Sequence, residues 1–251
     1  MSWYEGKHAV VTGGATGIGI ATAKVLRDKG ATVTIMARNE KRLAEAATEL
    51  DCAYQVADVA DRGAVRRAFE DAVAESGEVE ILVNNAGLAE AMPFTKMTDE
   101  HWDRVIDVNL TGVFNCSRAV MPAMAERESG TIVNVASTAG VAGYAYVAAY
   151  CAAKHGVIGL TRSLALEFAT RGITVNAVCP GYTETDLVSR TIDKIVAATG
   201  RSPEDARAEL LRQNPQGRFV QPEEVADTII WLCRQRSMNG QSIGIAGGEI
   251  M

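Results

Sequence analysis

The chain has 251 residues, 47% of them hydrophobic and 22% charged, which is typical of a globular protein able to bury a substantial core. Its net charge of −6 offers no basic face, so we expect no nucleic-acid partner. Five scattered cysteines without a C-x-x-C pair predict no disulfide framework and no metal site, and no apolar run suits a signal peptide or a membrane span. We therefore expect a cytoplasmic protein without a membrane partner.

Short β-branched runs alternate with helical patterns along the chain. Strands are predicted at residues 8–12, 32–36, 52–56, 80–83, 130–135, 173–178 and 241–245. Helices are predicted at residues 20–29, 40–50, 62–75, 148–169 and 223–233, and within 99–124, while residues 182–219 are less regular with helical pieces. Such β–α alternation predicts a parallel sheet covered by helices on both faces. Because no repeat or linker divides the chain, we predict an α/β fold with one doubly wound Rossmann-type domain over residues 1–251.

The first predicted strand leads into a glycine-rich segment, residues 12–19, that is followed at once by a helix. Gly13 permits a sharp turn, Gly17 lets the backbone approach a pyrophosphate, and Gly19 lets the helix pack on the strand. Thr16 and Ile18 flank Gly17 where the helix begins, and we expect them to join the glycines in binding a dinucleotide. The spacing differs from the general G-x-G-x-x-G fingerprint, and a plain turn is the alternative.

The end of the second strand indicates which dinucleotide is bound. It carries no carboxylate for a ribose hydroxyl, and Arg38 stands beside the expected place. A guanidinium matches a 2′-phosphate, so we favour NADP(H), with NAD(H) possible and a solvated Arg38 as the alternative. After the third strand, Asp58 and Val59 are candidate adenine contacts, although Asp58 is equally suited to forming a turn. The residues after the fourth strand would let a flat cofactor lie close: Asn85, Ala86 and Gly87.

Four polar residues suggest acid–base chemistry. Tyr150 and Lys154 are four residues apart in a predicted helix and therefore share a face. A nearby positive charge favours a phenolate, so we expect Lys154 and the oxidised nicotinamide ring together to lower the pKa of Tyr150 from about 10 to about 7. Ser137 follows the fifth strand, and Asn109 lies inside a helical stretch. Each of these residues, seen alone, has an ordinary structural explanation.

Together these motifs resemble the short-chain dehydrogenase/reductase family over essentially the whole chain. The residues that carry the resemblance are Gly13, Gly17, Gly19, Asn85, Ala86, Gly87, Asn109, Ser137, Tyr150, Lys154, Pro180 and Gly181. The resemblance implies a seven-stranded parallel sheet and a homotetramer. It also implies an oxidoreductase that interconverts a small-molecule ketone and a secondary alcohol.

The resemblance further assigns roles to individual residues. Tyr150 would be the acid/base, Ser137 would bind the substrate oxygen, and Lys154 would hold the nicotinamide ribose. Asn109 would hold a water that connects Lys154 to solvent. The nicotinamide carboxamide and ring would be held after the sixth strand by Pro180, Gly181, Thr183 and Thr185.

The substrate is the least determined feature. Residues 172–186 are similar to those of 3-oxoacyl thioester reductases and aromatic polyketide ketoreductases, so we expect a 3-oxoacyl thioester or a similar apolar ketone. Residues 182–219 carry balanced charges and apolar positions, which suits a segment covering an apolar pocket, with a subunit contact or a surface loop as the alternative. Two other functions are open: a catabolic NAD-dependent 3-hydroxyacyl-CoA or secondary-alcohol dehydrogenase, and a non-catalytic dinucleotide-binding scaffold or sensor.

Overall fold

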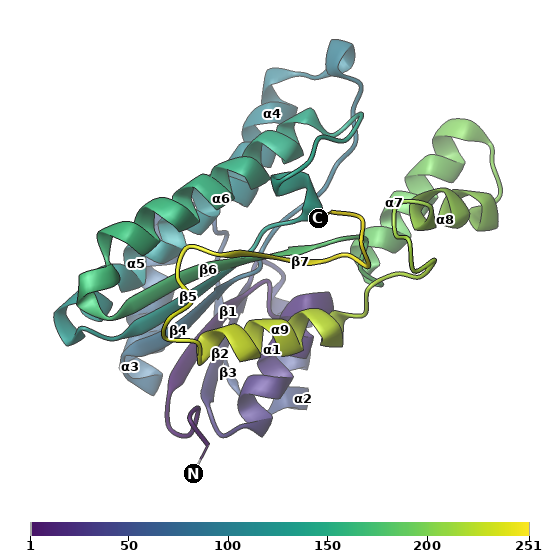
Figure 1. Cartoon of the computed structure of the whole chain (residues 1–251). Coiled ribbons are helices and arrows are strands. Elements are labelled where there is room, and N and C mark those ends of the chain that lie inside the picture. Colours follow the sequence, from purple (N-terminus) through teal and green to yellow (C-terminus); the bar gives the residue numbers. More distant parts are fainter. Residues whose placement is uncertain (1, 251) are drawn as a thin grey trace.

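The computed structural model describes residues 2–250 (Figure 1), so the two end residues of the predicted domain lie outside the described part. One parallel sheet has the strand order β3-β2-β1-β4-β5-β6-β7. Its strands are β1 (His8–Thr12), β2 (Thr32–Ala37), β3 (Ala53–Val56), β4 (Val79–Asn84), β5 (Gly130–Val135), β6 (Ile173–Pro180) and β7 (Ser242–Ile245). This arrangement confirms the predicted seven-stranded, doubly wound α/β fold.

Helices cover both faces of the sheet (Figure 1). One face carries α1 (Gly17–Asp28), α2 (Glu40–Leu50) and α9 (Pro222–Cys233), whose apolar side chains share one core cluster. The other face carries α3 (Arg62–Ser76), α5 (Gly112–Arg127) and α6 (Ala148–Glu167), with α4 (Asp99–Ile106) beside α6. Strand β1 shows why both layers form: Ala9 and Val11 enter the first cluster, and Val10 enters the second. Side chains alternate across a strand, so a strand apolar at every position is buried on both faces.

The sheet reverses its winding between β1 and β4. The chain runs from β1 outward to β2 and β3, then returns across β1 to β4 and continues to β7. In such sheets the crevice at the C-terminal ends of the strands, where the order reverses, is the usual place for a ligand. The turns after β1, β4, β5 and β6 meet at this edge, and together with the start of α1 they contain most of the predicted site residues.

Three element predictions need correction. Helix α1 begins at Gly17, not residue 20, because the extended Thr16 is its N-cap and the left-handed Gly17 opens its first turn. The region predicted as helical within 99–124 consists of α4, a π-helical turn at Asp107–Thr111, and α5. Residues 182–219 are more regular than expected and contain α7 (Asp186–Thr199) and α8 (Pro203–Leu211), which Figure 1 shows standing out from the body of the sheet.

Candidate active site

The turn between β1 and α1 is built around its glycines. Gly13 has φ +64° and Gly17 has φ +54°, which is the left-handed region where a side chain is unfavourable. A Cβ on Gly19 would collide with the carbonyl oxygen of Gly13 and lie 2.6 Å from Asn85 Nδ2. The first turn of α1 contains no acidic residue, so its free N–H groups are available to an anion.

A hydrogen-bond network fixes the end of β4 against this turn. The Asn85 side chain donates to the carbonyl oxygens of Thr12 and Gly13, at 3.0 and 3.1 Å. The backbone N–H groups of Asn85 and Ala86 both donate to the Thr12 hydroxyl at 3.0 Å. Thr12 was not among the predicted site residues. Its hydroxyl nevertheless joins the two segments that are expected to hold the cofactor.

A pocket of about 480 Å³ opens beside the turn. Its lining residues are Gly13, Ala15, Thr16, Ala37, Arg38, Asn39 and Arg42. Arg38 lies 3.4 Å from the Asp58 carboxylate, and Arg42 lies 3.6 Å from that of Asp186 at the start of α7. Arg42 was missed by the sequence prediction, although its position four residues after Arg38, in the first turn of α2, was available as a signal.

Asp58 and Val59 are less open to a ligand than predicted. One Asp58 oxygen accepts a hydrogen bond from the Ala60 N–H at 3.0 Å, which is the turn-forming role left open above, and the other faces Arg38. The Val59 side chain is buried in the core, and its carbonyl accepts from Asn115 at 2.9 Å. Only the backbone of Val59 is therefore suited to contacting an adenine.

The four candidate catalytic residues come from three segments of the chain that meet at the ligand edge. Ser137 follows β5, Tyr150 and Lys154 lie on α6, and Asn109 lies on the π turn. Lys154 Nζ lies 5.6 Å from the centre of the Tyr150 ring. A Cβ on Gly87 would be 2.9 Å from Asn109 Oδ1 and 3.7 Å from Lys154 Nζ, so these two side chains meet against the end of the β4 segment.

Backbone groups orient the buried members of this set. Lys154 Nζ donates to the Val135 carbonyl at 2.8 Å. The fully buried Asn109 donates to the carbonyl oxygens of Leu88 and Val105, each at 2.9 Å, and accepts from the Leu88 N–H at 3.2 Å. The π turn widens the helix at this point, and such turns are frequent at functional sites because they re-aim a side chain.

Burial controls the titration of the pair on α6. It raises the pKa of Tyr150 to about 12, against the opposite influence of a hydrogen bond with Ser137. It lowers the pKa of Lys154 to about 8. The predicted lowering of the Tyr150 pKa toward neutrality is therefore not found in the protein by itself, because removal of the phenol from water outweighs the hydrogen bond with Ser137.

The segment after β6 folds back toward the glycine-rich turn. The Thr183 side chain is buried and its hydroxyl donates to the Gly181 carbonyl at 3.0 Å, while the Thr185 hydroxyl donates to the Thr183 carbonyl at 3.2 Å. A Cβ on Gly17 would lie 2.9 Å from the Thr185 methyl carbon. Gly181 and the threonines therefore close the crevice opposite the start of α1.

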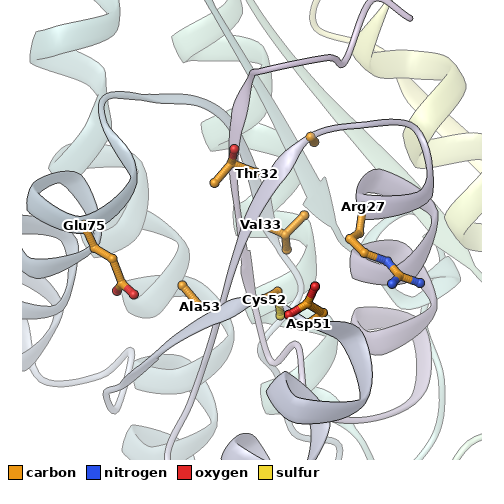
Figure 2. Close-up of a pocket in the computed structure, with 8 residues that line it drawn as sticks. Arg27, Thr32, Val33, Asp51, Cys52, Ala53 and Glu75 are labelled. Atoms are coloured by element: carbon orange, nitrogen blue, oxygen red, sulfur yellow. The ribbon is translucent and has the colours of Figure 1, made fainter.

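The opposite edge of the sheet has a second pocket, of about 450 Å³ (Figure 2). It lies where β2 and β3 begin, and Figure 2 shows Thr32, Val33 and Ala53 between Arg27 on α1 and Glu75 on α3. The start of parallel strands is the structural end of such sheets and not the ligand-binding end. We assign no function to this pocket.

Within residues 2–250, no group of three or more His, Cys, Asp and Glu side chains is placed to hold a metal ion. In the same described part of the chain, no helix has both the length and the apolar character needed to cross a membrane.

Comparison with known proteins places this fold and site in a family. Residues 7–195 match the model of the short chain dehydrogenases. A 3-oxoacyl-[acyl-carrier-protein] reductase of Thermotoga maritima is 41% identical and matches 98% of this chain and 99% of its own length. A D-beta-hydroxybutyrate dehydrogenase of Cupriavidus necator is 35% identical, with 98% of each chain matched. The crystal structure of an actinorhodin polyketide ketoreductase variant with NADPH superposes with a TM-score of 0.94 at 36% identity, covering 99% of each chain. The chain belongs to the short-chain dehydrogenase family and is an oxidoreductase.

Proposed function

We propose that this protein is an NADP(H)-dependent reductase that converts a ketone into a secondary alcohol, and that its substrate is a 3-oxoacyl thioester or a similar apolar ketone. The observation that carries the proposal is the convergence of Ser137, Tyr150, Lys154 and Asn109 beside the glycine-rich turn. The names of the reductases among its relatives support the reaction and the substrate class.

The residues present suit the cofactor. The glycine-rich turn leaves backbone space that a Cβ would fill, and the start of α1 has no competing acid. Arg38 and Arg42 give the adjoining pocket two guanidinium groups, which suit a 2′-phosphate. The residues that would hold the dinucleotide are Gly13, Thr16, Gly17, Ile18, Gly19, Arg38, Asp58, Val59, Asn85, Ala86, Gly87, Tyr150, Lys154, Pro180, Gly181, Thr183 and Thr185. Bound there, the cofactor supplies the hydride and, once oxidised, a positive ring that favours a nearby phenolate.

The side chains divide the proton chemistry among them. The Ser137 hydroxyl donates to the substrate oxygen and fixes it close to Tyr150, which gives its phenolic proton to the developing alkoxide. A phenol with a pKa near 12 keeps this proton until the alkoxide, a stronger base, is formed. Lys154 stabilises the phenolate that remains, and Asn109 connects Lys154 with solvent through a water molecule.

One relative favours a second candidate function. The D-beta-hydroxybutyrate dehydrogenase shares the fold over 98% of its length, and oxidation of a hydroxy acid would use the same four side chains. Arg38 and Arg42 beside the glycine-rich turn favour NADP(H) and hence reduction. A non-catalytic scaffold or sensor is disfavoured because all four candidate catalytic residues are present at the ligand edge.

Steady-state assays with acetoacetyl-CoA test the proposal directly. We expect turnover with NADPH and a clearly lower kcat/KM with NADH. A matched panel contains a sugar, a steroid and 3-hydroxybutyrate, each with both cofactors. Good turnover of a panel compound alongside no reduction of acetoacetyl-CoA would overturn the proposed substrate class.

The assembly and location of the protein are proposals as well. Leu166 on α6 is 82% exposed, and Phe114 on α5 and Trp102 on α4 are also exposed. Large apolar side chains in such positions suit a subunit interface, and they support the homotetramer. We also retain a cytoplasmic location, one domain over residues 1–251, and a substrate-covering role for residues 182–219.

A further inference from the structure

A carboxylate lies beside the candidate catalytic residues and has no place in the mechanism above. Glu249 follows β7, and Figure 1 shows the C-terminal end of the chain next to the loop that precedes α6. The Tyr144 hydroxyl from that loop donates a hydrogen bond to Glu249 Oε1. Among the residues that the structure describes, Glu249 Oε2 is buried and has no hydrogen-bond partner.

Three contacts place this carboxylate at the substrate side of the crevice. A Cβ on Gly181 would lie 2.7 Å from Glu249 Oε2, so the carboxylate fills the space over the segment after β6. Tyr144 also shares a side-chain hydrogen bond with Thr138, which adjoins Ser137. Burial and the charge of Glu249 raise the pKa of Tyr182, and Tyr182 in turn helps to raise the pKa of Tyr150. Tyr144 and Tyr182 therefore connect Glu249 with the surroundings of Ser137 and Tyr150.

We propose that Glu249, held by Tyr144, determines substrate specificity by excluding ketones that carry a carboxylate near the reacting carbonyl. A carboxylate with one oxygen unpartnered in a partly buried site repels a second anion strongly, because little water screens the two charges. The same oxygen can accept a hydrogen bond from an N–H or O–H group of a neutral substrate. A 3-oxoacyl thioester fits this requirement, since it has no charge at the carbon where a free 3-oxo acid ends.

This inference rests on the proposed ketone reduction and separates its two candidate substrate classes. A repulsive group that weakens the binding of free acids makes a thioester reductase more specific. Specificity is a difference between two affinities, so it increases when the competitor binds less tightly. A hydroxy-acid dehydrogenase would instead need a cation at this place. No Lys or Arg lies among the described contacts of Glu249 and Tyr144.

The test compares two ketones that share the 3-oxobutanoyl group, which ends in a neutral thioester in one and in a carboxylate in the other. S-acetoacetyl-N-acetylcysteamine is the neutral thioester, acetoacetate is the anion, and both are assayed with NADPH; acetoacetate is also tested as an inhibitor of thioester reduction. For Glu249→Gln we expect the ratio of kcat/KM between thioester and acetoacetate to fall about tenfold and acetoacetate to inhibit more strongly. Tyr144→Phe keeps the charge of Glu249 but removes the hydrogen bond that holds the carboxylate in place. It should lower the same ratio about threefold.

The control is Glu126→Gln, which makes the same change at an exposed site near the end of α5, at the other edge of the sheet. It should leave the ratio as in the unmodified protein. An unchanged ratio and unchanged inhibition in both Glu249→Gln and Tyr144→Phe, with thioester reduction intact, would overturn the inference and leave the proposed function standing. Failure of the unmodified protein to reduce either ketone would overturn both.

Discussion

Lys154 carries its amino group in a buried position, donating to the Val135 carbonyl. Burial lowers its pKa from 10.5 to about 8, so the folded protein releases this proton at lower pH than the unfolded chain does. Below pH 8 the buried charge costs stability, and this cost disappears as pH rises from about 8 to 10.5. The residue that the chemistry requires therefore opposes folding at neutral pH.

Lys154→Met removes this titration. We expect the unmodified protein to gain up to roughly 3 kcal/mol of unfolding free energy relative to the variant between about pH 8 and 10.5. Urea denaturation of both proteins across this range measures the difference, and the other titrating groups cancel because both proteins contain them. If the unfolding free energies of the two proteins changed in parallel across this pH range, the lowered pKa of Lys154 would be contradicted.

Arg38 makes the cofactor preference testable at a single side chain. Loss of a charge-assisted contact to phosphate costs about 1.5–3 kcal/mol, so Arg38→Ala should weaken NADPH binding roughly tenfold to a hundredfold and leave NADH almost unaffected. Arg42→Ala should act in the same direction. The control is Lys41→Ala, which removes an exposed positive charge from the same helix turn without lining the pocket. An equal loss for both dinucleotides in Arg38→Ala would refute the 2′-phosphate role.

At the scale of elements, the junction of β1 and α1 depends on close backbone packing. A methyl group at Gly19 would meet the backbone of Gly13 and the Asn85 side chain, neither of which can move without breaking the network to Thr12. We expect Gly19→Ala to lower the unfolding free energy by about 2 kcal/mol and to abolish measurable NADPH binding. Denaturant unfolding and fluorescence titration check the two effects.

Gly63→Ala is the matched control, because Gly63 lies in the first turn of α3 and its added methyl would meet only side-chain ends, at 3.3 Å or more. Alanine has the higher helix propensity, so this variant should be unchanged or more stable by up to about 1 kcal/mol. If Gly19→Ala matched Gly63→Ala in unfolding free energy and in NADPH binding, close packing at Gly19 would not explain the junction.

The sequence patterns predicted where the strands lie, but they did not predict the π turn or separate helices α7 and α8. Period and β-branching placed all seven strands to within two residues at each end. The signal is strongest for β1, β5 and β6, which are buried at every position and are therefore mainly apolar. The π turn at Asp107–Thr111 was not foreseeable, since one extra residue per turn leaves a helical pattern almost intact. Helices α7 and α8 were not distinguished from the sequence because their buried apolar side chains pack with Phe219 in a small cluster of their own: Val188, Ile192, Ala206 and Leu210.

Long-range contacts limited the prediction of the site in the same way. Local motifs indicated Tyr150 and Lys154, because their spacing within one helix already places them together. The pairing of Tyr144 with Glu249 joins residues 105 positions apart, and no local pattern reveals it. The direction of the Tyr150 pKa shift was missed because burial, and not the neighbouring lysine, dominates it.

For the whole molecule, the exposed apolar side chains of α5 and α6 predict the assembly. We expect light scattering to give a mass near four times the chain mass of 26.7 kDa. Leu166→Glu should reduce this mass, because a charge placed in an apolar interface is desolvated without a partner. A monomeric unmodified protein would contradict the proposal, and an unchanged tetramer in the variant would show that Leu166 lies outside the interface.

The most direct test of the account is the rate of NADPH oxidation by a 3-oxoacyl thioester in Tyr150→Phe. The change removes only the phenolic oxygen, and a positioned acid contributes about a hundredfold to ten-thousandfold, so kcat should fall by about a thousandfold while NADPH binding stays within a few-fold. Tyr54→Phe, at an exposed position on β3, makes the same change away from the site and should retain full activity. Unimpaired reduction by Tyr150→Phe would contradict the assignment of Tyr150 as the proton donor.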